Sequence, residues 1–225
     1  MCGDSGIVID DANNCAMPCK CQDERRRERL FTNSKITPAF RSKAFDNFKA
    51  KGRPEAVVKM LMAARHYANS FSELGENNWL VLLGEPGCGK THLIMVVANQ
   101  LLSKGEAVLY FPYAEGLSEL KDTFNKRGEA SLEDRLRELR KVPFLVVDDL
   151  FKCREVVNGW PKEIMFDILN YRYLNLLPTA ISSERKPTDL LRVDPAIGSR
   201  ILERGKGHIA VADGDSYAIN YRLVQ

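Results

Sequence analysis

Hydrophobic residues are distributed along this chain in two alternating patterns. Short, continuous apolar runs are separated by longer stretches in which apolar residues recur every three or four positions. Continuous short runs are typical of buried strands, whereas the second spacing places apolar side chains on one face of a helix. The short runs predict strands at 79–84, 107–112, 144–149, 178–183 and 208–212.

Helices are expected in the longer stretches. Pro54 suits the first turn of the earliest one, because a helix makes no use of the N–H group there. The helical spacing occurs at 53–71, 90–103, 114–126, 131–140, 161–176 and 195–204. Strands that alternate with helices predict a parallel sheet covered by helices on both faces, so we expect residues 51–225 to form one α/β domain.

The first 50 residues have a different character and are expected to form a small module and a linker. Residues 1–21 lack apolar periodicity and contain four of the six cysteines, which indicates a loop-rich, cysteine-rich module. The linker that follows is basic and helix-prone, with Phe40, Phe45 and Phe48 at helical spacing. Its run of arginines between residues 25 and 29 fits either a solvated helix face or a patch for nucleic acid or a partner.

Composition adds that this is an ordinary globular protein. The 225 residues are 44% hydrophobic and 28% charged, with a formal net charge of +3. This small charge allows a local nucleic-acid patch without requiring one. The longest uncharged run, 91–103, is too short for the roughly 20 apolar residues of a membrane helix, and the N-terminus lacks the features of a signal peptide. We therefore expect a cytoplasmic protein with no membrane partner.

The sequence GEPGCGKT at 84–91 matches the phosphate-binding loop G-x-x-x-x-G-K-[ST] and lies between a predicted strand and a predicted helix, as that loop requires. Its glycines let the backbone wrap around phosphates, and N–H groups of the loop and of the helix N-terminus point at the anion. Lys90 is expected to reach the β- and γ-phosphates of ATP, and Thr91 to ligate Mg²⁺. The predicted nucleotide-binding residues are Gly84, Glu85, Pro86, Gly87, Cys88, Gly89, Lys90, Thr91, His92 and Asp148.

Two acids end the apolar run FLVVDD, which is what the second half of such a nucleotide site needs. Asp148 is expected to hold Mg²⁺ through the water shell of the ion. Asp149 is placed to orient or activate the attacking water. Many P-loop ATPases have Glu at this second place, so the shorter Asp predicts slow hydrolysis that suits a switch better than a motor.

Two further groups of residues are candidates for catalysis. Ser183, with Ser182 beside it, ends the predicted strand at 178–183 and can lie near the γ-phosphate, although it also fits an ordinary strand end. Arg200 and Arg204 lie one helical turn apart. Either could complete the site of a neighbouring subunit, because a guanidinium stabilises charge on the transferred phosphoryl group. A solvated helix face is the alternative.

The segments GEPGCGKTHL, FLVVDDLF, PTAISSE and AIGSRILERG resemble, in order and spacing, the DnaC/DnaI-type bacterial and phage helicase loaders of the AAA+ class. IstB-like transposition proteins share much of this pattern. The resemblance implies a P-loop AAA+ ATPase domain with Ser183 at the sensor-1 strand end. It also implies Arg200 as the arginine finger, with Arg204 as its fallback, and a sensor-2-like contact at Arg222. The chain has Ser182, Ser183 and Glu184 where loaders often have Asn.

The same resemblance implies a function and partners. A loader binds the hexameric replicative DNA helicase through its N-terminal region, binds single-stranded DNA with its ATPase domain, and self-associates through an ATP-dependent interface. An IstB-like ATPase helper of DNA transposition is the alternative, and a metal-dependent adaptor with a regulatory nucleotide site is a third. The candidate DNA contacts, which also fit a solvated helix end, are Lys121, Phe124, Lys126 and Arg127.

The N-terminal cysteines predict a zinc site. In a reducing cytosol clustered thiols bind metal more often than they form disulfides, and a short module without a core needs such a link to fold. Four thiols can close a tetrahedral Zn²⁺ site. The candidate ligands are Cys2, Cys15, Cys19 and Cys21. The loader resemblance singles out Cys2, Cys19 and Cys21, with Cys15 as a substitute for a missing partner. Cys88 and Cys153 are expected to be buried or to be present for their small size.

Overall fold

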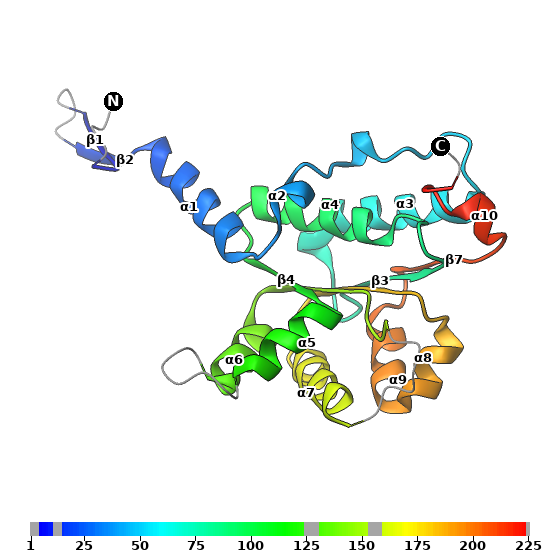
Figure 1. Cartoon of the computed structure of the whole chain (residues 1–225). Coiled ribbons are helices and arrows are strands. Elements are labelled where there is room, and N and C mark those ends of the chain that lie inside the picture. The colour runs from blue at the N-terminus through cyan, green and yellow to red at the C-terminus, as the bar shows by residue number, and fades with distance from the viewer. Residues whose placement is uncertain (1–4, 11–14, 124–130, 153–158, 224–225) are drawn as a thin grey trace.

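A parallel sheet forms the central layer of the computed structural model, which describes residues 5–10, 15–123, 131–152 and 159–223 (Figure 1). Its strands pair in the order β4-β5-β6-β3-β7, all of them parallel. Their bounds are β3 Trp79–Gly84, β4 Val108–Pro112, β5 Phe144–Asp148, β6 Thr179–Ser183 and β7 Ile209–Ala212. The predicted parallel sheet is therefore confirmed, and the strand ends lie within one residue of the expected ranges.

Helices cover both faces of this sheet, as predicted (Figure 1). On one face lie α3 (Glu55–Asn69) and α4 (Lys90–Ser103). On the other face lie α5 (Tyr113–Asp122), α6 (Leu132–Lys141), α7 (Trp160–Leu174), α8 (Pro187–Val193) and α9 (Pro195–Arg204). Helix α8 was not expected, because seven residues are too few to display a helical period. Helix α5 ends at Asp122, and the rest of the range expected for it includes residues outside the described part.

Strand β3 shows why its sequence is apolar without interruption. Leu80 and Leu82 pack into the core on the side of α3 and α4, whereas Trp79, Val81 and Leu83 pack into the core on the opposite side. Successive side chains of a strand point to opposite faces, and both faces of this sheet are covered by helices. Every residue of β3 is therefore buried, and the strand carries the phosphate loop at its rigid carboxyl end.

The N-terminal part is a hairpin and a projecting helix. Strands β1 (Ile7–Asp10) and β2 (Cys15–Pro18) pair antiparallel, and α1 (Lys20–Asn33) connects them to the body (Figure 1). No residue of α1 is buried. The hairpin was not predicted, because neither of its faces is buried against the body and its apolar and polar residues therefore do not alternate. The structure does not clearly show the compact cysteine-rich module that we expected at this end.

The linker after α1 packs on the α/β domain. Ile36 and Phe48 are 3% and 8% exposed and belong to the core beside α4. The Asn99 side chain of α4 donates hydrogen bonds to the carbonyl groups of Phe40 and Lys43, both at 2.9 Å. Short helices in this region and at the end of the chain are α2 (Pro38–Arg41), η1 (Phe45–Asn47), η2 (Phe71–Glu73) and α10 (Ser216–Ile219). The domain boundary expected after residue 50 stays a prediction. Residues just before it, such as Phe48, already pack in the core of the α/β domain.

Within the described residues no helix combines the length and the hydrophobicity needed to cross a membrane.

Candidate nucleotide-binding site

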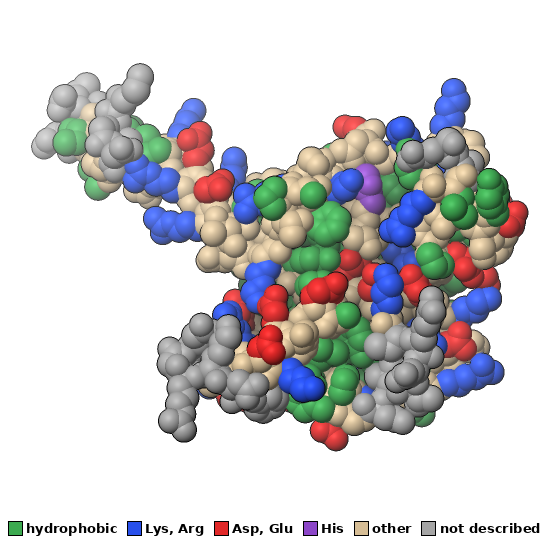
Figure 2. All heavy atoms as spheres, viewed as in Figure 1, with side chains coloured by type: hydrophobic (Ala, Val, Ile, Leu, Met, Phe, Trp, Pro, Cys, Tyr) green, Lys and Arg blue, Asp and Glu red, His purple; other side chains and the backbone are tan. Residues whose placement is uncertain are grey.

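The candidate site is a cavity of about 770 Å³ at the carboxyl ends of the central strands. Ligands of open α/β sheets bind at this edge, because the loops that leave the strands diverge there. Figure 2 shows acidic and basic side chains gathered along this face, between the two helical layers. The lining includes residues of the phosphate loop, of the strand ends and of the N-terminal linker. The structure therefore brings together segments that are far apart in the sequence.

The phosphate loop connects β3 to α4 and needs two of its glycines for space and backbone conformation. Gly87 has φ +74°, and a Cβ atom there would lie 1.9 Å from Oδ1 of Asn220. Gly89 has φ +107°, and a Cβ atom there would lie 2.5 Å from the Phe48 ring. Side chains other than hydrogen are therefore excluded at both positions. Because these glycines have no side chain, an anion can approach the backbone N–H groups of the loop at the N-terminus of α4, where anions bind favourably.

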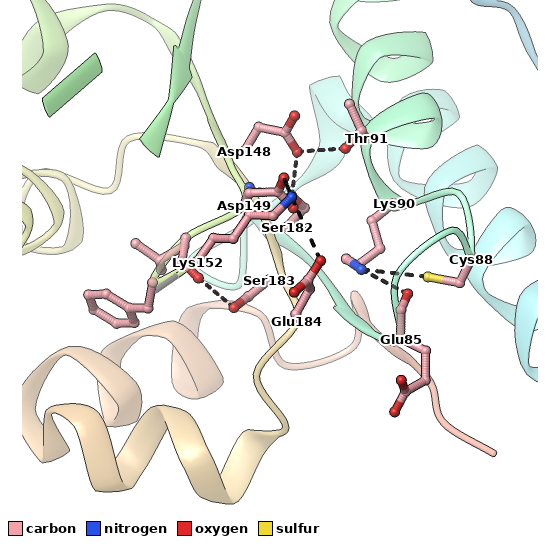
Figure 3. Close-up of polar contacts among 12 residues, drawn as sticks. Glu85, Cys88, Lys90, Thr91, Asp148, Asp149, Lys152, Ser182, Ser183 and Glu184 are labelled. Atoms are coloured by element: carbon pink, nitrogen blue, oxygen red, sulfur yellow. Dashed lines mark hydrogen bonds and ion pairs between the residues drawn. The ribbon is translucent and has the colours of Figure 1, made fainter. Parts of the chain in front are cut away.

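Lys90 lies inside this loop and is 5% exposed. Its ammonium donates to the carbonyl groups of Gly84 at 2.8 Å and Glu85 at 3.0 Å, and Sγ of the fully buried Cys88 is 3.8 Å away. The Glu85 carboxylate points away from Lys90 (Figure 3) and accepts a hydrogen bond from Ser216 at 3.2 Å. Because the carbonyl partners of Lys90 carry no net charge, a phosphate group would supply the counter-charge of its ammonium.

Asp148 is the centre of a cluster of hydroxyl groups. Thr91 donates to its Oδ1 at 3.0 Å, Ser182 donates to the same oxygen, and Tyr110 donates to Oδ2 at 3.1 Å (Figure 3 shows the first two). The carboxyl group is 4% exposed. Burial raises the pKa of Asp148, and these three hydrogen bonds act in the opposite direction. Carboxylate and hydroxyl oxygens are the ligands that Mg²⁺ prefers, so Thr91 and Asp148 fit the predicted metal site.

Tyr110 is a residue that the sequence analysis missed. It lies on β4, which was interpreted only as an apolar strand, and its hydroxyl reaches Asp148 because β4 and β5 are neighbours. Burial is the first cause, and the adjacent Asp148 the second, that raise the pKa of Tyr110 far above its usual value. Its hydroxyl therefore remains protonated and keeps donating to the carboxylate.

Asp149 follows β5 in a left-handed backbone conformation with φ +57°. Its N–H group donates to Oγ of Ser182 at 2.8 Å, and its carboxylate accepts a hydrogen bond from Lys152 at 2.6 Å (Figure 3). Non-glycine residues rarely adopt this conformation, which is found at functional sites where surrounding contacts impose it. Asp148 and Asp149 both line the cavity, as their predicted roles require.

The two serines that end β6 have different partners. The Ser182 hydroxyl contacts Asp148, whereas the Ser183 hydroxyl donates to the carbonyl group of Leu150 at 2.6 Å and is fully buried. Neighbouring side chains of a strand point to opposite faces, so only one of the two can reach a given carboxylate. The contacts bring Ser182 to the acids, and the sensor role assigned to Ser183 stays a prediction.

Arg200 and Arg204 lie on α9, away from the cavity lining. Arg200 donates to the carbonyl group of Ala196 at 2.7 Å, and its guanidinium lies 5.4 and 5.3 Å from the ring centres of Phe166 and Tyr173. Arg204 is 8% exposed and donates to the carbonyl group of Tyr173 at 3.0 Å. The structure does not bring either arginine to the phosphate loop of its own chain, so a role in a neighbouring subunit stays a prediction.

The linker and the C-terminal segment close the opposite side of the cavity. The Arg53 guanidinium donates to the carbonyl groups of Gly87 at 3.3 Å and of Ile219, and it lies 5.6 Å from the centre of the Tyr221 ring. The N–H group of Tyr221 donates to Gly87 at 3.1 Å. Arg222, the expected sensor-2-like residue, also lines the cavity. The sequence contains no local signal for Arg53 or Tyr221, because their contacts depend on the fold.

His92 connects the start of α4 to the linker. Its ring packs edge-on against Phe48 with centres 5.2 Å apart, and its Nε2 lies 3.3 Å from the carbonyl oxygen of Ala44. Burial lowers the pKa of His92, although the contact with Ala44 acts in the opposite direction. A neutral ring is therefore favoured at pH 7, and His92 lines the cavity as an uncharged residue.

The predicted zinc site is not supported. Within the ranges that the structure describes, no group of three or more His, Cys, Asp or Glu side chains is arranged to hold a metal ion. Cys15 is exposed on β2, and Cys19 and Cys21 are half-buried at the start of α1. The remaining candidate, Cys2, lies outside the described residues.

Other predicted residues also lie outside the described part of the chain. Among the candidate DNA contacts, Lys121 is exposed in the last turn of α5. Phe124, Lys126 and Arg127 belong to the residues that are not described, and so does Cys153. Their roles remain predictions.

Comparison with known proteins links this site to a family of nucleotide-binding proteins. The family model described as IstB-like ATP binding protein matches residues 18–223. The phage-like element PBSX protein XkdC of Bacillus subtilis (strain 168) is 38% identical, and the match covers 99% of this chain and 85% of that protein. The replicative helicase loader DnaC of Escherichia coli (strain K12) is 29% identical, with 85% of this chain and 76% of that protein covered.

Solved structures with a similar fold include those of DnaI and DnaC. The crystal structure of DnaI superimposes with a TM-score of 0.60 at 21% sequence identity and covers 80% of this chain and 94% of that one. The crystal structure of the DnaC helicase loader has a TM-score of 0.61 at 20% identity and covers 79% of this chain and 99% of that one. These likenesses show the fold.

Proposed function

The chain belongs to the IstB-like ATP binding protein family, and we propose that within this family it uses ATP to load a hexameric replicative DNA helicase onto single-stranded DNA during replication initiation. Its fold is that of AAA+ P-loop ATPases such as DnaI and DnaC. The observation that carries the proposal is the convergence of Lys90, Thr91 and Asp148 in one cavity of a chain that is 29% identical to a replicative helicase loader.

In this proposal the site binds ATP with Mg²⁺. The phosphate loop and Lys90 hold the phosphates, and Thr91 and Asp148 hold the metal, which would neutralise charge on the transferred phosphoryl group. Asp149 orients the attacking water, and Ser183 or Ser182 senses the γ-phosphate. The ATP-bound state is then a switch with slow hydrolysis, because the short Asp149 side chain is a poorly placed base.

The N-terminal hairpin and α1 are the proposed contact with the helicase. This proposal is supported by the exposure of apolar side chains on the hairpin. Ile7 and Ile9, which share one face of β1, are 47% and 69% exposed, and Met17, which pairs with Val8 on the other face, is 49% exposed. Exposed apolar groups that are neighbours, such as Ile7 and Ile9, are typical of protein interaction sites. A zinc ion held by the N-terminal cysteines would stabilise this end, and metal analysis of the purified chain tests that part of the proposal.

Single-stranded DNA and a second subunit are the other proposed partners. The segment that begins at Lys121 would contact the DNA backbone by charge and the bases by stacking. Arg200 would reach the ATP of a neighbouring subunit. This interface is supported by the position of Arg200, which does not line the nucleotide cavity of its own chain. Arg204 is buried, which favours a structural role for that residue.

A Lys90→Ala variant tests the loading function. We expect loss of ATP binding and of ATP-dependent helicase loading, because the phosphates lose the ammonium, while helicase still co-purifies with the variant. ATP binding is measured with a fluorescent analogue, and loading by the amount of helicase retained on single-stranded DNA. Normal loading by this variant would show that the nucleotide site has no part in the mechanism.

A deletion of residues 1–19 is the complementary variant. It removes the hairpin but leaves the linker, which packs in the core. We expect it to bind ATP normally and to lose co-purification with the helicase. If the full chain never binds a replicative helicase, the loader proposal fails.

A helper role in DNA transposition is the second candidate, because the matching family is described as IstB-like and IstB-like proteins include transposition helpers. The two functions differ in the protein that responds to ATP. A transposition helper would bind a transposase in an ATP-dependent manner and would leave the retention of helicase on DNA unchanged.

A further inference from the structure

Asp149, the acid proposed to direct the attacking water, is already engaged with a cation. The Lys152 ammonium donates a hydrogen bond to Oδ2 of Asp149 at 2.6 Å. Figure 3 shows the Lys152 side chain lying across Asp149. An ammonium at this distance occupies acceptor sites of the carboxylate, fixes its orientation and makes it a weaker base, so the carboxylate is less able to orient water or accept its proton.

The main chain fixes both ends of this ion pair. Asp149 and Phe151 have left-handed backbone conformations, with φ +57° and +59°. The N–H group of Lys152 donates to the carbonyl group of Asp149 at 3.0 Å, and the N–H group of Asp149 donates to Ser182 at 2.8 Å. The turn after β5 is therefore held from both sides. The Lys152 side chain starts from a position that directs it back over Asp149.

A second acid completes the arrangement. Glu184 follows β6, and its Oε1 lies 3.7 Å from the Lys152 ammonium. Lys152, Asp149 and Glu184 all line the cavity that contains the phosphate loop. Lys90 and Lys152, two of the lysines that line this cavity, differ in their partners, because Lys90 is bound by neutral carbonyl groups and Lys152 by two carboxylates. The phosphate-binding lysine is free to meet an anion, whereas Lys152 is held on the acids.

We propose that Lys152 is a positioning residue that locks Asp149 and thereby limits the rate of ATP hydrolysis. The inference rests on the proposed function, since it takes Asp149 as the acid that directs water. The ion pair with Lys152 would slow ATP turnover, in addition to the effect of the short Asp149 side chain. The Lys152 side chain is 51% exposed, so an anion that reaches its ammonium from solvent can open the lock.

The test is steady-state ATP hydrolysis by the full chain with Lys152→Met, which removes the charge and keeps the length of the side chain. We expect kcat to rise about two- to fivefold, the range that the loss of a partly exposed ion pair supports, with KM for ATP unchanged. Lys152→Arg is expected to restore the low rate, because a guanidinium can bind the same carboxylate.

Two further variants separate a lock on Asp149 from a general effect. In the double variant Lys152→Met with Asp149→Asn, kcat is expected to equal that of Asp149→Asn alone, because the lock acts only through this carboxylate. Lys59→Met is the matched control: Lys59 forms a 2.8 Å ion pair with Glu55 on α3, away from the cavity, so kcat should not change.

A lower or unchanged kcat in Lys152→Met would overturn the inference, and a lower one would indicate that Lys152 contacts the phosphates instead. ATP binding, measured with a fluorescent analogue in the same variants, distinguishes this result from failure of the proposed function. If the wild-type chain binds no ATP, the proposed function fails first. If it binds ATP but neither it nor Lys152→Met hydrolyses it, the lock alone is contradicted.

Discussion

At the scale of single residues, the metal-binding carboxylate is held by hydroxyl groups from three separate places in the sequence. Thr91 comes from the start of α4, Ser182 from the end of β6 and Tyr110 from β4. Groups that donate to a ligating carboxylate fix its orientation before the metal arrives. Tyr110 is the one among the three that is not expected to touch the metal or the nucleotide, so it isolates this effect.

Tyr110→Phe is expected to weaken the affinity of the ATP-bound chain for Mg²⁺ about tenfold, as the loss of other groups that orient metal ligands does. The ring is kept, so packing against β5 changes little. Titration of Mg²⁺ into the chain with a fluorescent ATP analogue measures this affinity. Tyr67→Phe is the control, because Tyr67 is a buried tyrosine that donates to Asn78 at 2.6 Å, far from the cavity. Equal Mg²⁺ affinities in wild type and Tyr110→Phe would contradict the role of the hydroxyl.

At the scale of elements, α9 is positioned by a charged cap. Asp194 precedes the helix, and its Oδ1 accepts hydrogen bonds from the N–H groups of Ala196 at 2.8 Å and Ile197 at 2.9 Å. Its Oδ2 lies 3.0 Å from the Lys162 ammonium of α7. Burial would raise the pKa of Asp194, but the N–H of Ile197 and the ammonium of Lys162 outweigh it and lower the pKa. The cap thus connects two helices and fixes the start of the helix that carries Arg200.

Asp194→Ala is expected to lower the free energy of unfolding by about 1 to 2 kcal/mol at pH 7, the usual cost of losing a cap. Because the pKa of Asp194 is lowered by folding, its stabilisation is present above the unfolded pKa of about 3.9 and is lost as the pH falls through the lower folded value. Urea unfolding of both proteins at pH 7 and in acid measures the difference. Asp194→Asn keeps the capping oxygen without the charge, so it should recover only the part of the stability that does not depend on pH. A difference that stays constant into acid would contradict the charged cap.

At the scale of the whole molecule, segments from both ends of the chain enclose the phosphate loop. Phe48 of the linker packs over Gly89, and Arg53 binds the carbonyl group of Gly87. Tyr221, close to the other end of the chain, donates to the same carbonyl group. The N-terminal segment that we propose as the helicase contact therefore continues directly into a wall of the nucleotide cavity.

Phe48→Ala is expected to lower the free energy of unfolding by about 3 kcal/mol, because it leaves a cavity between the linker and the core. It should also weaken ATP binding, since the ring covers the phosphate loop. Urea unfolding and titration with a fluorescent ATP analogue measure the two effects. Phe166→Ala, which removes a partly exposed ring from α7, should change ATP affinity little. Unchanged ATP affinity in Phe48→Ala would show that the linker does not support the loop.

The sequence by itself determined the features that are written in short, continuous segments. Each strand of the central sheet could be located because strands covered on both sides are continuously apolar, and the phosphate loop and the acids after β5 could be located because their spacing is local. Helix α8 and the N-terminal hairpin were not predicted, because the first is too short to display a period and the second has no buried face.

Only the tertiary structure decided which side chains meet. Tyr110 contacts Asp148 because β4 lies beside β5, and Ser182 reaches the same acid where Ser183 does not, because the pairing of β5 with β6 selects one face of the strand. Lys152 lies close to Asp149 in sequence, but its contact with Glu184 needs two strand ends to be neighbours. Such contacts depend on sheet order and register, which arise from packing between distant segments and leave no local pattern in the chain.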